Sequence, residues 1–161
     1  MFMSVGRVLL LGVVATAVMD ILVTLARMAH VVTPLPPTLL GRWVASISRG
    51  HVRHASIEQA APVGHELVIA LLAHYAVGVV FALLYLLATS RLDMSPRSAG
   101  AAITFGLATC VFPWLLMFPA MGFGLFGVRG PPGTPLFLSS LVGHAAYGAG
   151  IWLGARVPGV I

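Results

Sequence analysis

The chain has 161 residues, of which 59% are hydrophobic and only 8% are charged. Soluble domains carry about 25% charged residues, so this chain has too few polar side chains to cover a soluble globule. The formal net charge of +5 comes from nine basic residues, all of them arginine, against four acidic ones. These arginines are scattered singly between apolar runs, with no basic stripe carrying stacking aromatics, which argues against nucleic acid as a partner.

Four long apolar runs dominate the sequence. A helix needs about 20 mostly apolar residues to cross a hydrocarbon core of about 30 Å. The runs that reach this length cover about residues 8–29, 67–89, 99–121 and 136–157. They are continuous and rich in Ala and Leu, and they lack the alternation of a membrane barrel strand. We therefore predict an all-α integral membrane four-helix bundle, a single domain over residues 1–161 in contact with the lipid bilayer.

The first run also has features of a signal peptide. Arg7 precedes the apolar stretch, and Ala15 and Ala17 give the small-x-small form of a cleavage site. The apolar character continues to Ala29, beyond the length of a signal-peptide core. We therefore predict a retained helix.

The loop at 30–66 is the only long connection. Three prolines open it, and the apolar residues around Trp43 predict a short interfacial helix. The loop contains His51, His54, Glu58 and His65, but their spacing is not that of a zinc protease. We interpret the segment as a basic, water-exposed interfacial loop, with a metal or anion site as the alternative.

Prolines and glycines interrupt the second half of the chain. Pro113 and Pro119 predict a bend or break in the third run, and glycines follow at positions 122, 124 and 127. Broken helices line substrate sites in some transporters, although prolines are also ordinary in membrane helices.

The second and fourth runs share a pattern. Residues 71–78 and 141–148 both read Leu-x-x-His-x-x-x-Gly. The first and third runs resemble each other more weakly, through Gly12 and Thr16 in one and Gly106 and Thr109 in the other. This pattern predicts two parallel helical hairpins repeated about an axis along the membrane normal. Coincidence in a Gly- and Ala-rich background is the alternative.

Asp20 lies near the middle of the first run. A carboxylate there costs about 2.5 to 3.5 kcal/mol, while each Leu, Ile or Val returns about 0.3 to 0.6 kcal/mol. Thr16, Asp20, Thr24 and Arg27 recur at intervals of four, four and three, and therefore form one polar stripe along a helix. We predict that this stripe faces the protein interior.

Several polar side chains of different runs lie at similar depth. At about 1.5 Å per residue, Asp20, His74 and His144 all lie about 12 to 15 Å below the same membrane face. We therefore predict one buried polar layer formed by Asp20, His74, His144, Thr16, Thr24 and Cys110.

This layer fits several roles. Asp20 and His74 can hydrogen-bond and fix helix packing, or they can belong to a path for protons or a solute. His74 and His144 could instead hold haem b, with Gly78 and Gly148 leaving room for the ring. A metal ion bound by the same two histidines, Asp20 and Cys110 is a further alternative.

No catalytic motif is present: the chain has no nucleophile elbow, phosphate loop, dinucleotide fingerprint or zinc signature. We expect a non-enzymatic membrane protein without a cofactor, with haem b or a metal ion as the alternative. The expected role of the protein is solute or proton movement, or assembly with a partner. The partner would be a second copy, in a homo-oligomer, or another subunit of a membrane complex. A structural accessory subunit is the remaining alternative.

Four strings of the chain carry a family resemblance. Residues 12–20, 41–44, 49–57 and 73–78 resemble a bacterial family of small inner-membrane proteins classed as a domain of unknown function. The resemblance covers nearly the whole chain and implies a multi-pass protein of the bacterial inner membrane, without implying an activity. Arg53, His54 and Ser56 lie within the matched loop string, and they are therefore further candidate site residues.

Overall fold

The computed structural model describes residues 4–133 and 135–161, and every regular element among them is helical. Four helices are long and apolar enough to cross a membrane: Val5–Met28, Glu66–Arg91, Ala99–Met121 and Leu136–Gly154. They overlap the four predicted runs. The all-α prediction is therefore confirmed, and the lengths and composition of these helices indicate a membrane protein.

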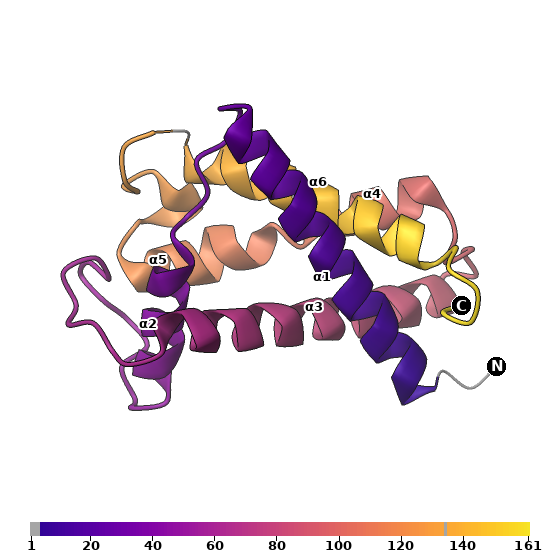
Figure 1. The fold of residues 1–161 in the computed structure, drawn as a ribbon, viewed down its shortest axis with the longest axis horizontal. Coiled ribbons are helices and arrows are strands. Elements are labelled where there is room, and N and C mark those ends of the chain that lie inside the picture. Colours follow the sequence, from indigo (N-terminus) through magenta and orange to yellow (C-terminus); the bar gives the residue numbers. More distant parts are fainter. Residues whose placement is uncertain (1–3, 134) are drawn as a thin grey trace.

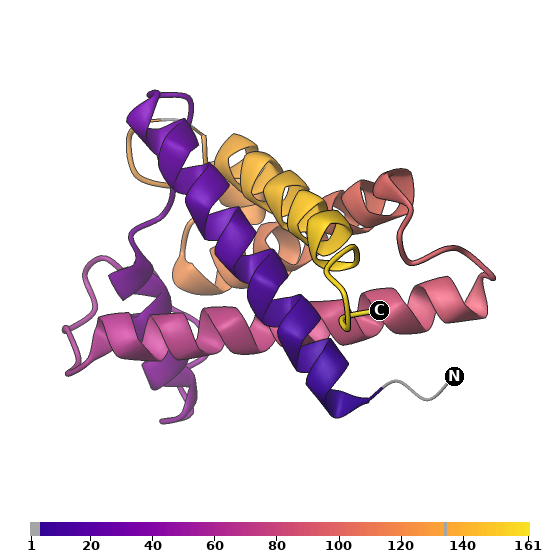
Figure 2. The ribbon, with the colours of Figure 1, turned by 45° about the vertical axis from the view of Figure 1, so that its right-hand side comes forward.

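The helices alternate in direction. Helix α1 (Val5–Met28) packs against both α3 (Glu66–Arg91) and α6 (Leu136–Gly154), and α6 packs in turn against α4 (Ala99–Ala108). Figures 1 and 2 show α1 crossing α3 at a steep angle, with α6 beside α1. The end of α1 and the start of α3 and α6 lie at one end of the molecule, which we call the loop end. The start of α1 lies at the other end (Figure 1).

The crossing of α1 and α3 depends on two glycines. A Cβ atom on Gly12 would lie 2.5 Å from the Val79 Cα atom, and one on Gly78 would collide with the Thr16 hydroxyl. The two backbones therefore approach as closely as glycine allows, which is a common way for membrane helices to gain packing contacts.

The crossing of α4 and α6 also depends on two glycines. A Cβ atom on Gly106 would collide with the His144 carbonyl, and one on Gly148 would lie 2.6 Å from the Ala102 carbonyl oxygen. Both crossings thus use the glycines on which the predicted repeat rests.

The contact between α3 and the third span differs from these crossings. Aromatic rings separate the two helices: Phe81 lies 5.3 Å from Phe112, and Tyr85 lies 5.3 Å from Phe105, between ring centroids. An exact two-fold repeat would make this contact equivalent to the close packing of α1 on α6. The two contacts differ, so the two-hairpin repeat remains a prediction.

The third span is broken into pieces, as its prolines predict. Helix α4 ends at Ala108, a π-helical turn η1 covers Pro113–Met117, and α5 covers Phe118–Met121. Pro113 has no N–H to donate to the residue four positions earlier, and the same holds for Pro119. At the end of η1 the ladder shifts, so that Phe118 N–H donates to the Pro113 carbonyl, five residues earlier. A short 3-10 helix η2 (Leu125–Gly127) follows.

The predicted interfacial helix is α2 (Pro37–Ile47), which packs against α3. A Cβ atom on Gly41 would collide with the Glu66 carbonyl, so α2 lies directly on the first turn of α3.

The glycine crossings generate a first prediction. Gly106→Ala should lower the free energy of unfolding by about 1 to 3 kcal/mol, because the added methyl group forces α4 away from α6. Gly100→Ala on the same helix is the matched control, since its Cβ would meet only Ser98 Oγ, at 4.0 Å. Thermal unfolding followed by size-exclusion chromatography in detergent measures both variants. Equal stability of the two would contradict the close crossing.

Candidate functional site

The first polar site joins α1 and α3, about a third of each helix away from the loop end. His74 Nε2 lies 3.0 Å from Asp20 Oδ1, and the Tyr75 hydroxyl donates to Asp20 Oδ2 at 3.1 Å. An ionised carboxylate only accepts hydrogen bonds, so the His74 Nε2–H donates to it. The structure therefore brings Asp20 and His74 together, and it adds Tyr75, which the sequence analysis missed.

This site is half-exposed. The side chain of Asp20 is 41% exposed and that of His74 is 29% exposed. An open hollow beside them is lined by Asp20, Ile21, Thr24 and Leu25.

The prediction that the whole polar stripe of α1 faces the interior is wrong. Thr16 is buried and donates to the Gly12 carbonyl at 2.8 Å, whereas Thr24 and Arg27 are exposed. The reason is the steep crossing angle, because α1 touches α3 around Gly12 and Thr16 and moves away from it towards its C-terminal end.

The second polar site joins α6 and the third span. Thr109 Oγ1 lies 2.7 Å from His144 Nδ1, and its hydroxyl donates to the Gly106 carbonyl at 2.5 Å. The hydroxyl has one proton, so satisfying both contacts requires His144 Nδ1–H to donate to Thr109. This tautomer leaves His144 Nε2 as a hydrogen-bond acceptor.

Cys110 is fully buried beside the second site. Its thiol lies 3.7 Å from the Ser140 carbonyl oxygen, and the Trp114 indole N–H donates to the Ser140 hydroxyl at 2.7 Å. Thr109 and Cys110 both lie at the break between α4 and η1. The break thus places a hydroxyl and a thiol against α6.

The hydrogen bonds of the predicted layer form two groups, and the single layer remains a prediction. Each histidine bonds a residue of its own hairpin: His74 bonds Asp20, and His144 bonds Thr109. The Tyr147 hydroxyl of α6 donates to the Gly78 carbonyl of α3 at 2.6 Å and so links the two hairpins. Within residues 4–133 and 135–161, no three His, Cys, Asp or Glu side chains lie close enough to hold a metal ion.

The residues do not fit the haem alternative. His74 Nε2 is occupied by Asp20. Gly78 is covered by Thr16, and Gly148 by the Ala102 backbone, so neither glycine leaves room for a planar ring beside its histidine. The glycines serve the helix crossings instead.

The loop candidates lie against the end of the third span. His54 N–H donates to the Ala120 carbonyl at 2.8 Å, and Ile57 N–H donates to the Met121 carbonyl at 3.0 Å. Arg53 is exposed, and Ser56 is partly buried. His54 Nε2 is buried and has no hydrogen-bond partner among the described residues. The loop string therefore docks through its backbone.

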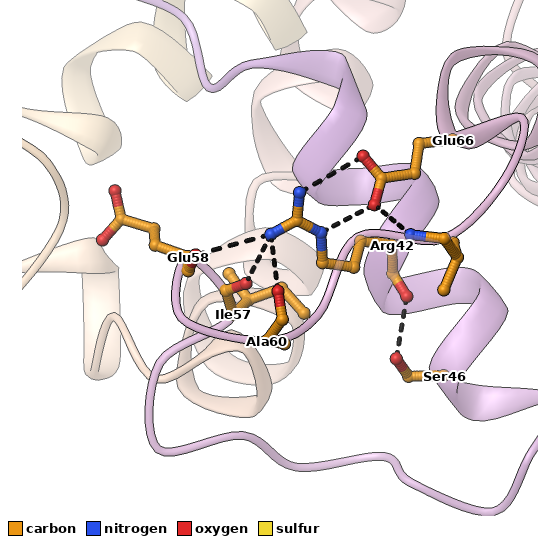
Figure 3. Close-up of polar contacts among 7 residues, drawn as sticks. Arg42, Ser46, Ile57, Glu58, Ala60 and Glu66 are labelled. Atoms are coloured by element: carbon orange, nitrogen blue, oxygen red, sulfur yellow. Dashed lines mark hydrogen bonds and ion pairs between the residues drawn. The ribbon is translucent and has the colours of Figure 1, made fainter.

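Arg42 holds this loop in place, which the sequence analysis did not predict. Its guanidinium group donates to both carboxylate oxygens of Glu66, with Nε 2.7 Å from Oε1 and NH2 3.3 Å from Oε2 (Figure 3). It also donates to the loop carbonyls of Ile57, Glu58 and Ala60. The hydrogen bond to Glu66 raises the pKa of Arg42 above its ordinary value. The available sequence signal was a single Arg in an interfacial helix followed by an acidic residue at the start of a span.

A second prediction concerns this ion pair. Arg42→Ala should loosen the loop, because Glu66 loses its charged partner and three carbonyls lose a donor; a hydrogen bond to a charged group contributes about 1.5 to 3 kcal/mol. We expect hydrogen exchange in the segment 57–60 to accelerate by roughly tenfold or more. Arg53→Ala, at an exposed position of the same loop, should leave exchange unchanged. Equal exchange rates in both variants would contradict the role of Arg42.

Comparisons with known proteins give one match. A family model described as "Protein of unknown function (DUF2938)" matches residues 9–158. Neither the curated proteins nor the solved structures contain a match to the chain. Since the matched segment includes all four long helices except the first residues of α1, the chain belongs to this family of proteins of unknown function.

Proposed function

We propose that the chain is a non-enzymatic multi-pass protein of the bacterial inner membrane that takes up and releases a proton at the Asp20–His74 pair during solute or proton movement. One observation carries this proposal. The Asp20 carboxylate accepts hydrogen bonds from both His74 and Tyr75 within a helix long and apolar enough to cross a membrane, yet its side chain remains 41% exposed.

The energetics of the pair support proton exchange. An ionised carboxylate at the centre of a span costs about 2.5 to 3.5 kcal/mol, and ionisable residues at membrane depth are often parts of proton relays. Imidazole is the side chain that most readily changes its charge between pH 5 and 8. In this proposal the proton is exchanged at the hydrogen bond between Asp20 and His74, whose side chains are both partly exposed.

The second site supports the same role less directly. His144 keeps Nε2 as an acceptor, and the break at Thr109 and Cys110 gives the third span an irregular backbone. Irregular backbone at membrane depth is tolerated where it is covered by protein or lines a cavity.

Infrared spectroscopy provides the direct test of proton uptake. Lowering the pH of the membrane-reconstituted protein should convert carboxylate bands into the C=O band of a carboxylic acid. The Asp20→Asn variant should lose the part of this change that arises within the membrane. Asp93→Asn is the matched control, because these are the only two aspartates and Asp93 lies in the connection between α3 and α4. If both variants lose the same bands, or if neither does, Asp20 does not exchange a proton.

Proton flux is the functional measurement. In vesicles with a potassium diffusion potential, an enclosed pH dye should report faster acidification with the wild-type protein than in protein-free vesicles. Asp20→Asn should reduce the rate to that of protein-free vesicles, and Asp93→Asn should not. Undiminished flux in Asp20→Asn, with the variant eluting as wild type in size-exclusion chromatography, would contradict the part of Asp20. Wild-type flux no faster than that of protein-free vesicles would favour the structural accessory role over proton movement.

A further inference from the structure

One face of α1 is not covered by the chain itself. The hollow beside the first polar site has Asp20 and Thr24 as its polar residues and Ile21 and Leu25 as its apolar ones. Ile21 is 59% exposed and Leu25 is 55% exposed. The other side of α1 packs on α3 and α6, so this face points away from the rest of the molecule.

On this face, Asp20 can accept further hydrogen bonds and Thr24 can donate one. Each oxygen of the Asp20 carboxylate accepts one hydrogen bond from α3, and each has a second lone pair. The Thr24 hydroxyl forms no hydrogen bond to any other residue that the structure describes. An acceptor and a donor thus lie one turn apart on the same helix.

Lipid tails cannot use this capacity. Hydrocarbon offers no hydrogen bond to Asp20 or Thr24, and ionisable side chains at membrane depth almost always face protein or a water-filled cavity. A protein surface that offers a donor to Asp20 and an acceptor to Thr24 would satisfy both groups and cover the apolar residues beside them.

A second copy of α1 offers this pair of groups. In two parallel copies related by a two-fold axis along the membrane normal, equivalent residues lie at equal depth. Interlocked helices bring a residue of one copy next to the residue four positions along in the other. Asp20 of each copy then meets Thr24 of the other, while Ile21 and Leu25 pack beside them.

We infer that the chain forms a homodimer through this face of α1, and that Thr24 of each copy donates a hydrogen bond to Asp20 of the other. The neighbouring copy contributes a residue to the polar site and separates it from lipid. The dimer interface does not depend on the proposed proton exchange at Asp20.

Cysteine cross-linking tests where the two copies meet. In a Cys110→Ala background, which removes the only cysteine, single cysteines replace Ile21 or Leu25. The control is Leu72→Cys, which is 69% exposed and lies two residues from His74, so that it points to another side of α3. Oxidation in native membranes should give a dimer through position 21 or 25 and none through position 72. Absence of a dimer at both α1 positions, an equal yield at position 72, or cross-linking only to a different protein would overturn the inference.

Threonine variants test the hydrogen bond itself. Thr24→Val removes the hydroxyl at nearly constant shape, and Thr24→Ser retains it. Energy transfer between labelled copies in vesicles should show a dissociation constant raised roughly tenfold in Thr24→Val, since two equivalent hydrogen bonds are lost. The Thr24→Ser variant should dimerise like the wild type. Equal dissociation constants for the two variants would overturn the proposed bond.

The outcomes also separate this inference from the proposed function. A monomer whose Asp20 still titrates in the infrared would overturn the dimer alone. A dimer whose Asp20 does not titrate would overturn proton exchange alone.

Discussion

The close approach of α1 and α3 at Gly12 and Gly78 determines where the polar side chains of both helices lie. Because the two backbones nearly touch there, Thr16 is buried and must bond its own helix. One turn further along, Asp20 reaches His74 and Tyr75 before the helices separate. Beyond that point α1 is no longer covered by α3, which leaves Thr24 exposed. A single pair of glycines thus sets the burial of the entire stripe.

The second hairpin combines a similar crossing with a broken helix. Pro113 cannot continue the hydrogen-bond ladder of α4, and the backbone turns at Thr109 and Cys110. The same two residues supply the hydroxyl that bonds His144 and the thiol that lies against α6. The break is therefore also the segment that provides the polar contacts of this hairpin. The first hairpin uses a carboxylate from a continuous helix instead.

The sequence predicts the elements well because their signals are local. Length and hydropathy predict four spans, prolines predict the break in the third, and depth along the helix predicts that Asp20 can meet His74. The exposure of Thr24 and Arg27 was not predictable in the same way, because the periodicity of a polar stripe does not say how far a neighbouring helix covers it. The partners of Arg42 were also missed, since backbone carbonyls of a loop have no signature in the sequence.

The docking of the loop on the third span also has a consequence for the order in which the chain acquires its structure during synthesis. His54 and Ile57 donate to carbonyls of residues 120 and 121, which leave the ribosome more than sixty residues later. Arg42 and Glu66 are both present much earlier, so α2 can attach to α3 while the second half of the chain is still being made. Until the third span enters the membrane, the backbone N–H groups of the loop have only water as a partner. The loop is therefore one of the last parts of this membrane protein to reach its final conformation.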